Sequence, residues 1–224
     1  MSEEGDGLAG DKETKERLLE SAKKEFLEKG YMKASLRTIC KNAGVTTGAL
    51  YFFFQGKEDL LKELVEEPVK GLMGLIRQHF TEELEQGIGV VNLDTDRKDI
   101  RAAREIVGFL YQHYDIFLIL LTKSQGSAYE DLVSRFADYG EEHFQRLTSK
   151  AAQAYGILGP DEYMIHWMSH MQVNAFVHLL IHEPDMEKAL VNIEEVVVYL
   201  VSGWNGFFRQ GIKVKDSPDA GGDG

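Results

Sequence analysis

Several features that many proteins possess are scarce in this chain of 224 residues. It contains a single cysteine, Cys40, so no disulfide can form within the chain, as is typical of proteins in a reducing compartment. We interpret Cys40 as a small buried side chain rather than a redox sensor. No run reaches the roughly 18 apolar residues that cross a membrane, and the acidic, glycine-rich start is unlike a secretory signal. We therefore expect a cytoplasmic protein that makes no membrane contact.

Patterns that form strands or break helices are also scarce. Only four prolines occur, and no stretch alternates polar and apolar residues convincingly over the length of a strand. Apolar residues recur instead at helical spacing, and 43% of the chain is hydrophobic. The sequence therefore predicts an all-α fold of about nine helices, with enough apolar residues for one compact unit or two small ones.

Signatures of catalysis are missing as well. We find no nucleophile–base pair at helical spacing and no phosphate-binding loop. His166 and His170 are four residues apart, as are His178 and His182, and such pairs can chelate zinc or nickel. Each step of four residues drifts by about 40° around a helix, so the series cannot share one face. No acidic or cysteine partner stands at a convincing spacing, so we expect no metal, no cofactor and no enzymatic activity.

Charge is distributed unevenly along the chain, whose formal net charge is −12. Residues 12–62 hold eleven Lys or Arg and seven Asp or Glu, whereas the remainder holds fourteen and thirty. A mildly basic N-terminal part is thus attached to a strongly acidic remainder. Because binding to phosphates needs local positive charge, we expect the N-terminal part to be the one that meets nucleic acid.

The basic part contains a pattern for two short helices joined by a tight turn. Ser35 suits the N-cap of the first helix, and Gly44 suits the left-handed position that ends it. Thr46 or Thr47 can cap the second helix, about Gly48 to Phe53, whose length suits insertion into a DNA major groove. The pattern predicts a helix–turn–helix.

Two motifs in this part resemble the TetR family of bacterial transcriptional regulators. The family motif Leu-Tyr-x-x-Phe, followed by a polar turn and Lys-Glu-x-Leu, is matched by Leu50, Tyr51, Phe54, Lys57, Glu58 and Leu60. The family's first helix and its Gly-Tyr exit are matched by Leu18, Leu19, Ala22, Phe26, Gly30 and Tyr31. The specific resemblance covers about residues 12–62, and the remainder is similar only in length and helical content.

The resemblance implies that different parts of the chain have different functions. A DNA-binding head is expected at residues 11–56, and a helical domain for ligand binding and dimerisation is expected at residues 57–212. We expect disorder at residues 1–10 and 213–224, because both ends are rich in glycine and acidic residues.

The resemblance also implies which residues of the head meet DNA. The start of the second helix would face base edges and phosphates, while Tyr51 and Lys57 would contact the phosphate backbone. Phe52 stands where the family often has a polar residue, and its ring either reaches a thymine methyl or a sugar or folds back onto the core. The implied DNA-binding residues are Ser35, Arg37, Thr46, Thr47, Gly48, Ala49, Tyr51, Phe52 and Lys57. The alternatives are that the threonines only cap the helix, that Tyr51 only packs, and that Lys57 is only solvated.

Aromatic and histidine side chains are dense between residues 109 and 167. Members of the family hold a small molecule in a pocket made by these helices, so the resemblance implies a ligand site here. The candidate ligand-binding residues are Phe109, His113, Phe117, Tyr129, Phe136 and Trp167. The alternative is that these side chains are ordinary core.

Two long helices are expected near the C-terminus, at about residues 161–182 and 186–210. The apolar face of each helix is wider than packing against one core requires. This excess favours pairing with a second copy of the chain as a four-helix bundle. The candidate interface residues are Met164, Met168, Met171, Val197, Val201, Trp204 and Phe208. Such a homodimer would present two recognition helices to the half-sites of a near-palindromic double-stranded DNA operator.

These observations predict a sequence-specific DNA-binding transcriptional regulator, in the form of a repressor that a small-molecule effector releases. Two alternatives stay open at this point. The first is an activator, or a regulator controlled by a protein partner. The second is a helical interaction protein whose DNA head is degenerate.

Overall fold

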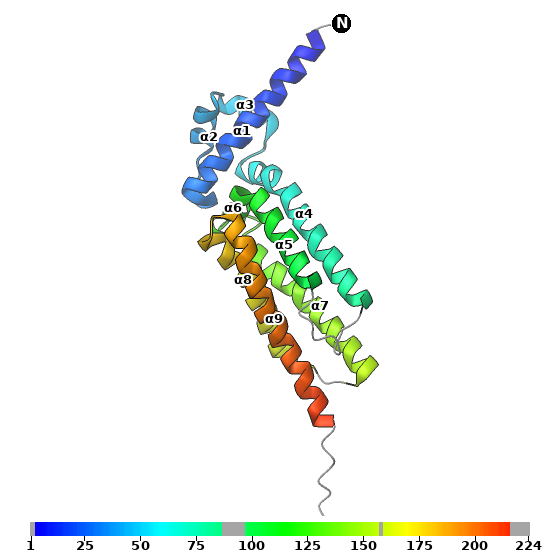
Figure 1. The fold of residues 1–224 in the computed structure, drawn as a ribbon. Helices are drawn as coiled ribbons and strands as arrows, with labels where there is room; N and C mark the ends of the chain where they lie inside the picture. Colours follow the sequence, from blue (N-terminus) through cyan, green and yellow to red (C-terminus); the bar gives the residue numbers. More distant parts are fainter. Residues whose placement is uncertain (1–2, 87–96, 157–158, 216–224) are drawn as a thin grey trace, which may run out of the picture. The chain divides into compact units, whose positions relative to one another are not determined.

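The computed structural model describes residues 3–86, 97–156 and 159–215, and every regular element in them is an α-helix (Figure 1). The helices are α1 (Glu3–Lys33), α2 (Leu36–Ala43), α3 (Thr47–Phe53), α4 (Lys57–Gln86), α5 (Arg97–Gln112), α6 (Tyr114–Thr122), α7 (Leu132–Tyr155), α8 (Glu162–His182) and α9 (Met186–Lys215). The predicted all-α fold is confirmed. Within the described residues, no helix combines the length and the apolar character that crossing a membrane requires.

The first and last helices extend into the two tails that the sequence predicts to be disordered. α1 begins at Glu3 and α9 continues to Lys215, so the disorder predicted for the two tails is wrong for the parts of them that the structure describes. Extending an existing helix costs far less free energy than nucleating one, so a glycine-rich flank can join it. The rest of the predicted tails, residues 1–2 and 216–224, lies outside the described residues.

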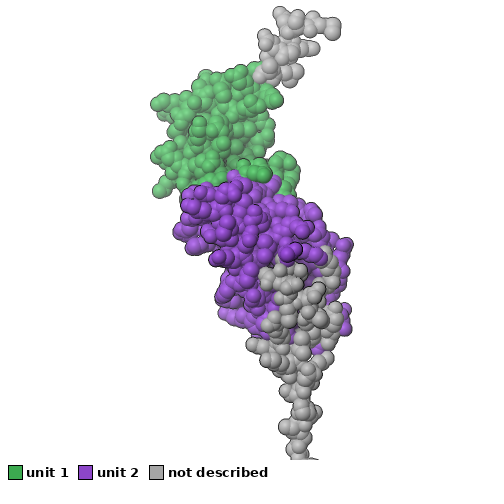
Figure 2. Space-filling model, in the orientation of Figure 1, with its two compact units in different colours: residues 1–72, 112–132 green, residues 73–111, 133–224 purple. Residues whose placement is uncertain are grey.

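The chain forms two compact units (Figure 2). Unit 1 comprises Met1–Leu72 and Gln112–Leu132, and therefore holds α1, α2, α3, the first half of α4, and α6. Unit 2 comprises Met73–Tyr111 and Val133–Gly224. The structure thus groups α6 and the start of α4 with the helix–turn–helix, whereas the sequence analysis assigned both to the C-terminal domain.

Unit 1 is built on regularly spaced apolar side chains. Leu18, Ala22 and Phe26 recur every four residues on α1, and all three are fully buried. Leu50 of α3 is fully buried as well, and burying a side chain of this size stabilises the fold by about 1.5–3 kcal/mol. Cys40 is also buried, and burial raises the pKa of its thiol, as expected for a packing residue.

The helix–turn–helix is fixed by its own caps. The Ser35 hydroxyl accepts a hydrogen bond from the Thr38 backbone N–H at 3.4 Å, which confirms Ser35 as the N-cap of α2. Gly44 has φ 68° and ψ 32°, the left-handed conformation in which a side chain is disfavoured. The Thr46 hydroxyl accepts from the Ala49 N–H at 3.1 Å, so Thr46 caps α3. Local sequence therefore sets the geometry of this motif.

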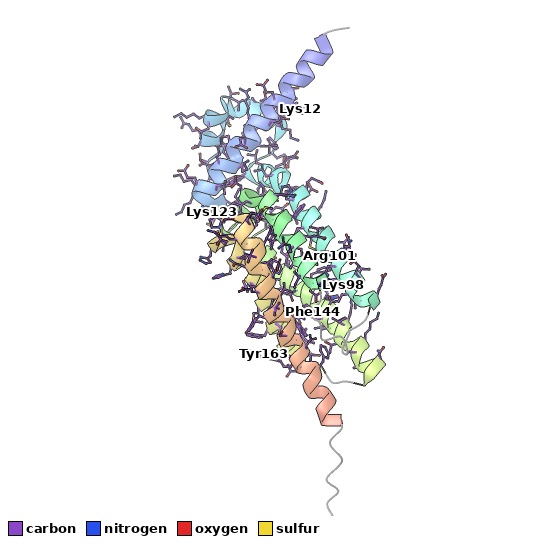
Figure 3. The ribbon with its side chains drawn as sticks, viewed as in Figure 1. Lys12, Lys98, Arg101, Lys123, Phe144 and Tyr163 are labelled. Carbon is purple, nitrogen blue, oxygen red and sulfur yellow. The ribbon has the colours of Figure 1, made fainter. Side chains whose placement is uncertain are left out.

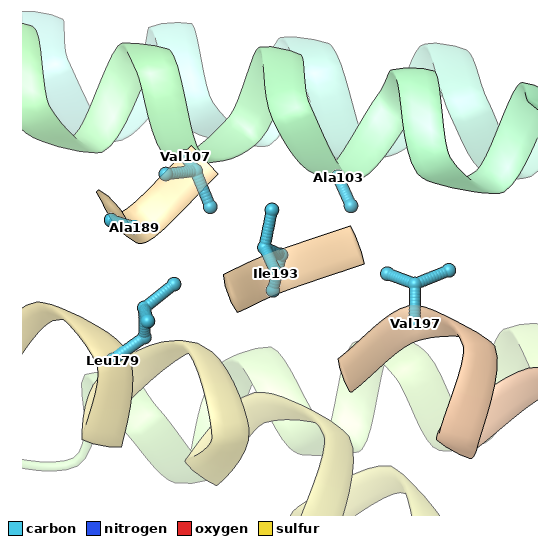
Figure 4. Packing of buried hydrophobic residues seen from close by; sticks show 6 residues of the cluster. All are labelled: Ala103, Val107, Leu179, Ala189, Ile193 and Val197. Carbon is cyan, nitrogen blue, oxygen red and sulfur yellow. The ribbon is translucent and has the colours of Figure 1, made fainter. Parts of the chain in front are cut away.

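Unit 2 has a core formed by three helices. Figure 4 shows its buried side chains, which are Ala103 and Val107 of α5, Leu179 of α8, and Ala189, Ile193 and Val197 of α9. A second cluster consists of Phe144, Leu147 and Ile165, with Leu84 and Trp204 packed against it. The inner faces of α8 and α9 are thus used within the chain itself.

Candidate nucleic-acid interface

The short helix α3 has one face in the core and the opposite face in solvent. Leu50 is fully buried, whereas Tyr51 and Phe52 are 57% and 74% exposed. Thr47 and Gly48 are exposed as well. Because successive residues lie 100° apart around a helix, the inward Leu50 turns Phe52 outward. The alternatives in which Phe52 folds back onto the core, or Tyr51 only packs, are therefore wrong.

The other candidates on α2 and α3 also lie at the surface of unit 1. Arg37 is exposed on the first turn of α2. The Ser35 and Thr46 hydroxyl oxygens accept the capping hydrogen bonds, and each hydroxyl keeps a proton that it can donate to a phosphate. Ala49 is half-buried. Capping and DNA contact are therefore compatible at the same side chain.

Lys57 has a different role in the structure from the one that the sequence predicts. Its ammonium group donates to the carbonyl oxygens of Tyr31 at 2.6 Å, Met32 at 3.1 Å and Ala34 at 3.3 Å. It also lies 4.6 Å from the centre of the Tyr31 ring. An ammonium has three protons, so all of them are used at the C-terminal end of α1. This geometry does not favour a phosphate contact, and Lys57 instead joins the start of α4 to the end of α1.

Glu58 makes the complementary contacts from the next position. Its carboxylate accepts from the Tyr31 hydroxyl at 2.6 Å and from the Ala128 backbone N–H at 3.1 Å. Burial, together with this hydrogen bond, raises the pKa of Tyr31 to about 12, so the hydroxyl stays a donor. The sequence motif includes Glu58 but does not indicate its partners, because Ala128 is 70 residues away along the chain.

The end of α6 is also attached to the end of α1. The Tyr31 N–H donates to the Lys123 carbonyl oxygen at 2.8 Å, and the Lys123 ammonium donates to the Leu27 carbonyl oxygen. Lys123 is labelled in Figure 3. The backbone turns at Gly30, where φ is +74°. These bonds satisfy carbonyl groups that the end of a helix leaves open.

The six candidate ligand-binding residues are divided between the two units. Those in unit 1 are His113, Phe117 and Tyr129, and those in unit 2 are Phe109, Phe136 and Trp167. Phe117 and Phe136 are buried, whereas Trp167 is 47% exposed. Trp167 therefore faces solvent rather than an interior pocket, and ligand binding by the others stays a prediction.

Three of the seven candidate dimer-interface residues are buried inside a single chain. Met168, Val197 and Phe208 are only 2%, 6% and 5% exposed within a single chain. Their selection as interface residues is therefore wrong, because the chain's own core already covers them. The other four, Met164, Met171, Val201 and Trp204, are half-buried.

A different set of apolar side chains is exposed on the same two helices. It consists of Tyr163, Trp167 and Ile181 of α8 and Met186, Val191, Val198 and Tyr199 of α9. Tyr163, for example, projects from the first turn of α8 (Figure 3). A helical-wheel reading could have separated this outward face from the inward one, since the two differ only in phase.

Comparison with known proteins identifies the head. Residues 18–64 match the model of the family described as bacterial regulatory proteins, tetR family. The head is therefore similar to the DNA-binding segment of that family. This chain is 37% identical over 73 residues to the probable acrEF/envCD operon repressor of Escherichia coli K12, and the match covers 32% of each chain. It is 42% identical over 53 residues to the transcriptional repressor BepR of Brucella suis, which is 24% of this chain and 25% of that protein.

The chain thus matches about a quarter to a third of the length of these two curated relatives. Solved structures of TetR proteins match over a longer part. A transcriptional regulator from Aquifex aeolicus VF5 is 23% identical, with a TM-score of 0.52 over 82% of this chain and 97% of that one. A TetR-like regulator from Rhodococcus sp. RHA1 is 15% identical, with a TM-score of 0.59 over 85% and 96%. At these identities the likeness shows the fold alone.

Proposed function

We propose that this chain is a homodimeric transcriptional repressor, which binds a near-palindromic DNA operator through α3 and is released by a small-molecule effector. The observation that carries the proposal is the solvent-facing side of α3, where Tyr51 and Phe52 are exposed in a head that matches the family. Two relatives with a similar segment are named as repressors, which supports repression rather than activation.

The exposed residues of the head supply both kinds of contact that specific DNA binding needs. Arg37 and the hydroxyl of Tyr51 suit phosphate oxygens, which position the protein without reading sequence. Thr47 and Gly48, at the start of α3, suit base edges in the major groove. The ring of Phe52 offers no hydrogen bond and therefore suits a thymine methyl group.

The outward side chains of α8 and α9 support a homodimer. Seven large apolar side chains are exposed on these two helices, and exposed apolar surface of this kind is typical of binding surfaces. A two-fold dimer uses the same surface on both copies and places two copies of α3 on two half-sites. Doubling the mildly basic head also strengthens the electrostatic attraction to DNA.

Release by an effector requires only a difference in affinity. A small molecule that binds more tightly to the chain when it is off DNA lowers the fraction that is on DNA, by thermodynamic linkage. The operator sequence would identify the regulated genes. Because regulated genes and effectors are commonly related, those genes would narrow the choice of candidate effector molecules.

The experiment that tests the proposal is selection of duplexes from a random DNA pool by the purified full-length protein. We expect enrichment of one inverted repeat, and we expect sedimentation to show a dimer. A folded, dimeric protein that enriches no sequence would contradict the proposal.

Two variants then distinguish residues that position the protein on the DNA backbone from residues that read the base sequence. Tyr51→Phe removes one hydroxyl, and we expect about a tenfold loss of affinity for all sequences alike, as for one hydrogen bond. Thr47→Ala should instead reduce the discrimination between the selected repeat and single-base variants of it. Thr81→Ala, at an exposed threonine of α4 outside both the head and the outward face of α8 and α9, is the control and should change neither property.

A further inference from the structure

Two histidines on α8 stand side by side at the protein surface. The rings of His166 and His170, one helical turn apart, have centroids separated by 4.5 Å. The His166 side chain is 52% exposed. Imidazoles four residues apart on one helix can reach the same divalent ion, as they do in helical zinc motifs.

Tertiary structure adds a carboxylate that the local sequence does not indicate. Glu141 of α7 lies with its Oε2 atom 2.7 Å from Nδ1 of His166. Glu141 is 25 residues upstream, on another helix, so no sequence spacing within α8 could reveal it. A histidine that binds a metal usually donates its other ring N–H to a carboxylate in this way.

This hydrogen bond also selects the tautomer. A carboxylate accepts, so the proton of neutral His166 lies on Nδ1 and the lone pair lies on Nε2. Nε2 is then free to bind a metal ion together with the ring of His170. The carboxylate would raise the basicity of the ligand and hold its ring in place.

We propose that His166 and His170 bind a divalent transition-metal ion of the zinc, nickel or copper class, with Glu141 as the residue that orients His166. Imidazole nitrogens suit this class of ion, whereas calcium and magnesium prefer oxygen ligands. In the described part of the chain no group of three or more His, Cys, Asp or Glu is placed to share an ion. Two imidazole ligands would leave the remaining positions of such an ion to water. The inference does not depend on the proposed repressor function.

The same helix contains a natural control. His178 and His182 have the same spacing, and their ring centroids are 4.3 Å apart. Among the described residues, neither ring has a carboxylate in ion-pair contact of the kind that His166 makes. The two pairs therefore differ in the orienting carboxylate while sharing the helix and the spacing.

The test is calorimetric titration of the full-length chain, without a histidine tag and freed of metal by a chelator, with zinc chloride at about pH 7.5. We expect one zinc ion per chain. His166→Ala and His170→Ala should each weaken the affinity at least tenfold, and Glu141→Gln should weaken it about tenfold to a hundredfold. The double variant His178→Ala/His182→Ala should bind zinc as the unchanged chain does. Circular dichroism of each variant checks the fold.

Three results would overturn the inference. The first is the absence of saturable zinc binding by the folded chain. The second is an equal loss of affinity in the control double variant, which would mean that spacing alone decides binding. The third is unchanged affinity in Glu141→Gln, which would make the contact between Glu141 and His166 an ordinary surface ion pair.

Discussion

At the scale of single residues, the neighbouring Lys57 and Glu58 belong to one sequence motif but bind different groups. Lys57 donates to three carbonyl oxygens at the end of α1, and Glu58 accepts from Tyr31 and Ala128. A hydrogen bond to a charged group contributes about 1.5–3 kcal/mol to the stability of the folded state. Both residues therefore stabilise unit 1.

We expect Lys57→Met to lower the free energy of unfolding by about 2 kcal/mol, because it keeps the aliphatic stem and removes the ammonium that three carbonyls share. Urea unfolding followed by circular dichroism measures this change. Lys62→Met, at an exposed position of the same helix, is the control and should stay within about 0.5 kcal/mol of the unchanged chain. Unchanged stability in Lys57→Met, combined with weaker binding to every DNA sequence, would instead restore Lys57 as a phosphate contact.

A second residue whose surroundings matter is His79 of α4. Its Nε2 atom lies 3.6 Å from Oδ1 of Asp99, and burial lowers the pKa of His79 below its ordinary value of 6.5. Nearby charges modify this effect. Glu83, Glu82 and Glu105 oppose the lowering, and His143 adds to it. Burial, the largest of these causes, disfavours the protonated imidazole in the folded state.

The lowered pKa predicts that His79 makes the chain sensitive to acid. Below pH 6.5 the unfolded state binds a proton at His79 more readily than the folded state does, so stability falls as the pH falls. His79→Asn should therefore lose less stability between about pH 7.5 and about pH 5.5 than the unchanged chain. Urea unfolding at both pH values measures the difference. His182→Asn, at an exposed histidine, should keep the original pH dependence, and an identical dependence in His79→Asn would contradict the prediction.

At the scale of elements, the helix–turn–helix was predicted well because its signals are local. The residues that cap α2 and α3 lie within a few positions of the backbone groups that they bind. The start of α7 at Leu132 depends instead on contacts with distant residues, and residues 128–131 before it are not part of the helix. Those residues form turns instead, after Gly126 with φ +79° and with Glu58 bound to the Ala128 N–H.

The turn between α2 and α3 gives a test at this scale. Gly44→Ala should lower the free energy of unfolding by about 1 kcal/mol, because φ is +68° there and a side chain is disfavoured in that conformation. The cost is conformational rather than steric, since the nearest atom to an added Cβ is Arg17 Nη1 at 4.0 Å. Gly56→Ala is the matched control, with open space and no positive φ, and its stability should be equal or slightly higher. Thermal unfolding that ranks the two variants equally would contradict this account.

At the scale of the whole molecule, the excess of basic charge and the exposed apolar side chains of α8 and α9 lie in different parts of the chain. The basic excess lies in residues 12–62, whereas the large exposed apolar side chains of α8 and α9 lie in unit 2. A protein that meets DNA with one part and its own copy with another is expected to show such a separation. The separation of charge is visible in the sequence itself, whereas only the structure shows that three of the seven suggested interface residues, Met168, Val197 and Phe208, are buried within the chain.

The exposed face of α8 and α9 leads to a prediction about assembly. Tyr199 is 70% exposed, and Tyr199→Glu places a charge in the proposed interface. We expect it to raise the dimer dissociation constant at least about thirtyfold, the equivalent of about 2 kcal/mol, and to weaken binding to an inverted repeat. Sedimentation equilibrium measures the first effect. Met32→Glu changes a similarly exposed side chain of unit 1 and should leave the dimer intact, while equal dissociation in both variants would refute the assignment of this face.

The sequence by itself determined the helical class, the helix–turn–helix and the basic character of the head. Periodicity, caps and charge all act over a few residues along the chain, so they can be recognised without coordinates. Tertiary structure alone decided that Lys57 binds carbonyl groups of α1, that Glu58 reaches Ala128, and that Glu141 meets His166. It also decided which faces of α8 and α9 are covered by the chain's own core. These facts depend on distances between residues that are far apart in sequence, and such distances are set only when the helices pack together.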